Sequence, residues 1–78
     1  MDEPNTREVL MKTQMIDALC ADANSKILLA KMNIDVLLTN PVGVGDHPNI
    51  METIQGQLDI ISQNKDRLNV LEGTFHEF

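Results

Sequence analysis

Several residue types that small folds depend on are scarce in this chain. It has one cysteine in 78 residues, which excludes an internal disulfide and a cysteine-rich zinc cluster. Tryptophan and tyrosine are absent, so the two phenylalanines offer little for stacking nucleic-acid bases. A chain this short buries only about 60% of its unfolded surface. We therefore expect its stability to come from oligomerisation or from very good helix packing.

Basic residues are also scarce. Six Lys and Arg face twelve Asp and Glu, giving a net charge of −6, which argues against binding to nucleic acid or to an anionic membrane. The longest apolar-rich stretch, residues 26–38, contains charges and is too short to span a bilayer. The polar start has no signal-peptide pattern, and a lone thiol fits a reducing compartment. We expect a cytoplasmic protein with no cofactor, small-molecule substrate, nucleic-acid or membrane partner.

Apolar and small residues recur at intervals of four and three in the segment from about 5 to 39. This is the spacing of a coiled-coil seam. Asn5, followed by Glu8 three residues later, is typical of a helix N-terminus. The core seam of this segment consists of Val9, Thr13, Ile16, Cys20, Ala23, Ile27, Ala30, Ile34 and Leu37.

A second stripe lies on the opposite side of the same segment and includes Ala18. A helix that is apolar on two faces is usually buried on both, and one partner helix cannot cover two faces. The second stripe therefore predicts self-association. The residues that we expect at the oligomer interface are Met11, Met15, Leu29, Met32 and Val36.

The segment from about 48 to 72 shows the same spacing. Pro48 fits a first helical turn, and Gly73 predicts the helix end, leaving residues 73–78 as a tail; alternatively, the helix extends to Phe75. Gln57 and Asn64 form polar layers, which lower stability but fix register and partner number. The core seam of this segment reads Ile50, Ile54, Gln57, Ile61, Asn64, Leu68, Leu71, Phe75 and Phe78.

The connector, residues 40–47, separates the two segments. Pro41 stops the first helix, and Gly43 and Gly45 let the chain reverse. The chain, 1–78, is thus predicted to be one all-α domain: an antiparallel, coiled-coil-like two-helix hairpin that self-associates, most simply into a four-helix bundle. The predicted hairpin core is Ile16, Cys20, Ala23, Ile27, Ala30, Ile34 and Leu37 against Ile54, Leu58, Ile61, Leu68 and Leu71.

Candidate chemical groups all have simpler structural interpretations. The Gly-x-Gly turn before a helix could hold an anion, but no lysine follows and Asp46 adds negative charge. Asp46 and His47 are adjacent, and adjacent residues rarely point at one metal ion. Cys20 lies on the apolar core seam, where a thiol behaves as a small hydrophobe. The acidic residues lie off the core seams, and a hairpin offers no cleft for acid–base chemistry. We expect no catalytic, metal or cofactor site.

The connector is longer than a helical hairpin requires. Its surplus therefore predicts a partner-contact loop formed by Val42, Gly43, Val44, Gly45 and Asp46.

The stretch LLTNPVGVGDHPNI, followed by a short acidic helix, resembles small proteins of tailed phages, especially T4-like phages of marine bacteria. The resemblance covers roughly residues 37–54 and carries no assigned activity or catalytic residues. It implies a phage gene product that acts in the virion or in the cytoplasm of the infected cell.

Two functions fit these patterns. The first is a non-enzymatic structural or interaction protein: a small oligomerising helical-hairpin subunit or assembly factor. The alternative is a small regulatory protein that docks an apolar helix face on a host or viral enzyme.

Overall fold

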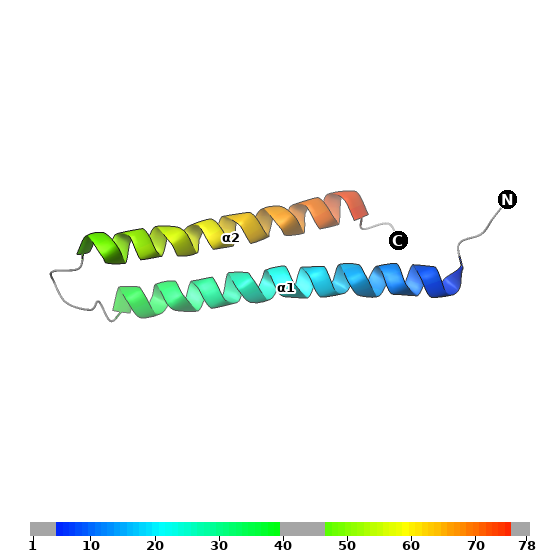
Figure 1. The fold of residues 1–78 in the computed structure, drawn as a ribbon, viewed down its shortest axis with the longest axis horizontal. Helices are drawn as coiled ribbons and strands as arrows, with labels where there is room; N and C mark the ends of the chain where they lie inside the picture. Colours follow the sequence, from blue (N-terminus) through cyan, green and yellow to red (C-terminus); the bar gives the residue numbers. More distant parts are fainter. Residues whose placement is uncertain (1–4, 40–46, 76–78) are drawn as a thin grey trace.

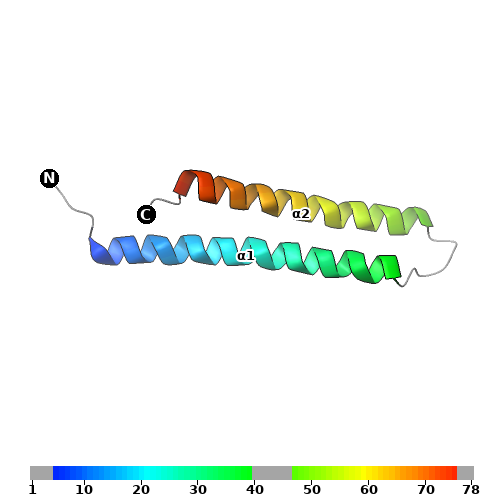
Figure 2. The same ribbon diagram turned by 180° about the vertical axis from the view of Figure 1, so that it is seen from behind.

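The computed structural model describes residues 5–39 and 47–75, which form two helices. Helix α1 spans Thr6–Thr39 and helix α2 spans His47–Phe75. They lie side by side and run in opposite directions, as seen from both sides in Figure 1 and Figure 2. The predicted antiparallel helical hairpin is therefore confirmed. With 34 residues, α1 is about 50 Å long at 1.5 Å per residue.

The helix ends follow the local sequence, with one exception. The Asn5 Oδ1 atom accepts a hydrogen bond from the Arg7 N–H at 2.9 Å, which confirms that Asn5 caps α1. Helix α2 begins at His47, one residue before the predicted start. It continues through Gly73 to Phe75, so of the two predicted ends, about residue 72 and residue 75, the later one is confirmed. A glycine within a helix costs only about 1 kcal/mol relative to alanine, which is too little to stop α2 at Gly73.

The hairpin core coincides with the predicted core seams. Among the described side chains, every one that is buried or half-buried occupies a core-seam position on α1 or α2. Only Ala23, Ala30 and Asn64 are nearly inaccessible, with exposed fractions of 2%, 1% and 2%. Phe75 is 41% exposed, and Phe78 lies outside the described residues. The alternation of four and three residues decided which face of each helix meets the other.

One residue of the predicted hairpin core was wrong. Leu58 is 51% exposed, whereas the neighbouring Gln57 is half-buried at the core seam. Gln57 Oε1 accepts a hydrogen bond from Asn33 Nδ2 of α1 at 3.1 Å. Helical register therefore overrides side-chain polarity here, because turning Leu58 inward would move every other seam residue of α2 off the core.

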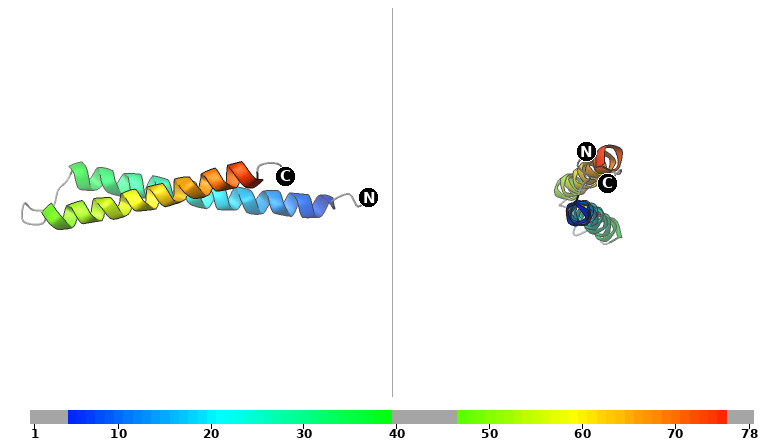
Figure 3. Two further views of the ribbon diagram at one scale, coloured as in Figure 1. Left: turned by 90° about the horizontal axis from the view of Figure 1, so that it is seen from above. Right: turned by 90° about the vertical axis from the view of Figure 1, so that its right-hand side faces the viewer.

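The two helices cross obliquely, and the end-on view in Figure 3 shows a single pair of helices with no further layer. Seams of this spacing pack at a crossing angle of about 20°. The Asn33–Gln57 bond shows the register: residues of α1 and α2 whose numbers add up to about 90 lie level with one another. A fold of two helices leaves one side of each helix uncovered.

Candidate functional site

Large apolar side chains are more numerous on the outside of the hairpin than inside it. Among the described residues, the fully buried apolar ones are only Ala23 and Ala30. By contrast, fourteen large hydrophobic residues in the described ranges are exposed, nine of them on α1. The nine are Leu10, Met11, Met15, Leu19, Leu28, Leu29, Met32, Val36 and Leu38.

The five residues predicted for the oligomer interface are all exposed on α1. Their exposed fractions are 57% for Met11, 60% for Met15, 61% for Leu29, 54% for Met32 and 58% for Val36. Helix α2 therefore leaves the second stripe bare. The stripe falls into two apolar halves on either side of Asp22 and Ser25, which occupy the two positions between Ala18 and Leu29 in the same spacing.

Three shallow concavities follow one side of the hairpin, between α1 and α2; we call this side the groove face. The concavity near the start of α1 has a volume of about 290 Å³ and is lined by Lys12, Met15, Ile16, Leu19, Leu71 and Phe75. The middle one, about 370 Å³, includes Leu19, Asp22, Asp66, Arg67 and Val70. The third, about 190 Å³, is lined by Lys26, Leu29, Ala30, Asn33, Gln57 and Ile60.

Four charged residues mark the middle of the groove face. Lys26 Nζ lies 2.9 Å from Asp22 Oδ2, an ion pair one helical turn apart on α1. Asp66 and Arg67 line the groove at the same level on α2. Both side chains of the Asp22–Lys26 pair are about half exposed, so water screens the attraction and the pair contributes little to stability.

The buried polar residue Asn64 is joined to this charged region. Asn64 Nδ2 donates to the Ile60 carbonyl at 2.8 Å, and Arg67 Nη1 donates to Asn64 Oδ1 at 3.4 Å. Both ends of the buried amide therefore have partners, which removes the main penalty of burying it. The polar layer predicted at Asn64 thus extends from the core seam to the groove face through Arg67.

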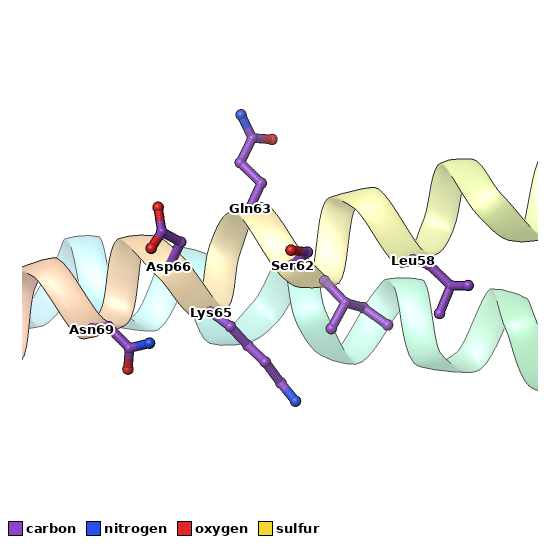
Figure 4. Close-up of a pocket in the computed structure, with 7 residues that line it drawn as sticks. Leu58, Ser62, Gln63, Lys65, Asp66 and Asn69 are labelled. Carbon is purple, nitrogen blue, oxygen red and sulfur yellow. The ribbon is translucent and has the colours of Figure 1, made fainter.

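A further depression, about 550 Å³, lies on α2 alone. Figure 4 shows that its side chains leave the helix in different directions, with Gln63 and Lys65 pointing to opposite sides. A small-molecule site requires polar groups that converge in an enclosed space. The groove face and the adjoining second stripe are therefore the stronger candidate for a functional surface.

The remaining candidates have little geometric support. Cys20 is half-buried on the core seam of α1, as predicted for a packing residue. Within the described ranges, 5–39 and 47–75, there is no group of three or more His, Cys, Asp and Glu side chains placed to hold a metal ion. Neither α1 nor α2 has a stretch long and apolar enough to cross a membrane. The proposed contact loop at 42–46 lies outside the described residues.

No family model, curated protein or solved structure matches this chain. The likeness of the connector to phage proteins therefore stays a prediction.

Proposed function

We propose that this chain is a non-enzymatic structural or interaction protein whose hairpin self-associates, most simply as a dimer that forms a four-helix bundle. The observation that carries the proposal is the exposed second stripe on α1. Contiguous apolar surface of this kind on a small protein typically marks an interaction site. A second hairpin provides two more helices, which is the simplest cover for two bare helix faces.

The exposed area supports the same proposal. The chain exposes 6389 Å². A compact folded monomer of this mass exposes about 4,700 Å², so the hairpin has roughly 1,700 Å² in excess. Obligate homodimers bury about 1,000–2,500 Å² per chain. The excess is therefore of the size that one such interface removes.

The test is the molecular mass in solution. We expect sedimentation equilibrium to give the mass of a dimer at micromolar concentration. The double variant Leu29→Asp, Val36→Asp places two carboxylates in the second stripe, and we expect it to weaken association more than about 100-fold because buried unpaired charge is so costly. A folded wild-type monomer across the concentration range contradicts the proposal.

A matched control is available on the same helix. Leu28 and Leu38 are 61% and 63% exposed, similar to Leu29 and Val36, but helical spacing places them on the other side of the core seam. Leu28→Asp, Leu38→Asp is expected to retain the dimer mass. If the control dissociates and the stripe variant does not, the interface lies on the side of α1 that carries Leu28 and Leu38, and the assignment to the second stripe is contradicted.

The three methionines of the second stripe favour one alternative. Methionine side chains adapt to different partners, so the stripe also fits a regulatory protein that docks on another protein. A hairpin that stays monomeric, folded and able to bind a hydrophobic dye supports this alternative over self-association.

A further inference from the structure

The second stripe of α1, which adjoins the groove face at Met15, Asp22 and Leu29, is nearly symmetric along the helix. On α1, the second stripe places Met11, Met15 and Ala18 before Asp22 and Ser25, and the three apolar residues Leu29, Met32 and Val36 after them. The stripe therefore reads nearly the same in both directions from a centre between residues 22 and 25. Across a two-fold axis residue i meets residue j and j meets i, so a stripe with apolar residues on both sides of a polar centre is complementary to itself.

The charges at the centre have the same property. Each helix carries one acid and one base at that level: Asp22 with Lys26 on α1, and Asp66 with Arg67 on α2. The four charges sum to zero in a chain whose net charge is −6. Two copies of this region can therefore meet without repulsion, although most of the remaining surface is acidic.

Resting on the self-association proposed above, we propose that the groove face of one hairpin packs on the groove face of a second copy, α1 antiparallel to α1 and α2 antiparallel to α2. The two-fold axis passes through the central charges. Asp22 then lies opposite Lys26 of the second copy, and Asp66 lies opposite Arg67 of the second copy.

The apolar residues meet in this arrangement as well. Leu19 lies level with Leu29 of the second copy, and both residues line the groove face. Apolar contacts thus flank a central band of ion pairs on both sides. The contacts contribute affinity, and the ion pairs fix the register, since a shifted pairing would bring like charges together.

A charge-reversal pair tests the alignment at Asp66 and Arg67. In a homodimer of Asp66→Lys, each new lysine faces an arginine, and in a homodimer of Arg67→Glu, each new glutamate faces an aspartate. We expect each variant alone to weaken dimerisation by about tenfold or more, because like charges oppose one another twice. In a mixture of the two variants, every facing pair is again opposite in sign. We expect the mixed dimer to regain wild-type affinity in sedimentation equilibrium.

The controls carry the same charge changes elsewhere on α2. Asp59→Lys and Lys65→Glu alter residues that do not line the groove face, and we expect them to leave the affinity within about threefold of the wild type. Circular dichroism checks that all four variants keep their helix content. If the two groove variants match the controls, or if mixing does not restore affinity, the proposed alignment is wrong while self-association stands. A monomeric wild type overturns both proposals.

Spin-label distances test the helix pairing independently. In a Cys20→Ala background, a single label at residue 35 is expected about 35 Å from its counterpart in the antiparallel pairing, from a rise of 1.5 Å per residue. A label at residue 25, next to the axis, is expected within about 15 Å of its counterpart, since packed helices lie 8–10 Å apart. Pairing of α1 on α2 of the second copy would bring the labels at residue 35 close together, and that result overturns the proposal.

Discussion

The two helices meet along one core seam but contribute different residues to it. Helix α1 brings Ala23 and Ala30, which are almost completely buried, and α2 brings the polar Gln57 and Asn64. On the outside α1 is again the more apolar helix, with nine exposed large apolar residues among the described residues, against five on α2.

This contrast indicates that the two helices contribute differently to the packing of the hairpin. Small residues on α1 let the helix axes approach, and polar residues on α2 restrict the alignments that satisfy their hydrogen bonds. The outer surface of α1 is the part suited to a partner, and most of α2 is suited to water. Substitutions that exchange these properties test the contrast, and we describe them from the largest expected effect to the smallest.

The largest effect is expected from filling the space that α1 leaves for α2. Ala30→Leu adds three carbons at a position only 1% exposed, and we expect it to lower the free energy of unfolding by about 3 kcal/mol, since overpacking forces the helices apart. Urea unfolding at a fixed chain concentration measures the change.

Ala21→Leu is the matched control, because Ala21 is exposed on the same helix. We expect it to alter the free energy of unfolding by less than about 0.5 kcal/mol. Equal losses in the two variants would show that close approach at Ala30 is not what holds the hairpin together.

The next largest effect is expected from replacing a polar residue in the core seam of α2 with an apolar one, as in the core seam of α1. Asn64→Leu removes a buried amide and leaves Arg67 without its acceptor. We expect the free energy of unfolding to rise by about 1 kcal/mol and the single oligomer mass to become a mixture, because a polar seam residue exchanges stability for specificity. Urea unfolding and sedimentation velocity report the two effects. A less stable variant with one unchanged mass would refute this role for Asn64.

The smallest effect is expected at the glycines of α2. A Cβ added at Gly56 or Gly73 meets no atom within 4 Å, so alanine fits at both positions. Gly56→Ala is expected to raise the free energy of unfolding by about 0.5–1 kcal/mol through the reduced entropy of the unfolded chain. Gly73→Ala lies in the last turn, where helices fray, and should give less than half of that in thermal melts. If Gly73→Ala raised the free energy of unfolding more than Gly56→Ala, the last turn of α2 would limit its stability more than the middle does, contrary to this prediction.

The sequence predicted the hairpin and its core seams because a period of four and three residues marks the inward face of a helix whatever it packs against. It predicted the Asn5 cap because a side-chain amide at that position satisfies a free N–H. Its errors came from weighing single residues above the pattern. Leu58 was assigned to the core for its hydrophobicity, and Gly73 was preferred as the helix end over the later end at Phe75, which is the one observed.

The groove face could not be predicted from the sequence, because it depends on the register between the helices. Asp22 and Arg67 are far apart in the chain, and they line one concavity only because α1 and α2 align with residue numbers that add up to about 90. The sequence pattern showed the second stripe, but it did not show which residues of α2 lie beside which residues of the stripe. The Asn33–Gln57 bond supplies that missing alignment.

The scarcity of fully buried side chains within one hairpin has a consequence for the amount of protein that a cell must hold. If another molecule covers the second stripe, as proposed above, it contributes much of the stabilising area, and the free energy of unfolding then depends on the concentration of that molecule. When that molecule is a second copy, halving the supply lowers the folded fraction as well as the number of chains. In that case the folded fraction depends on the amount of the chain itself, because dilute copies lose the partner that stabilises them.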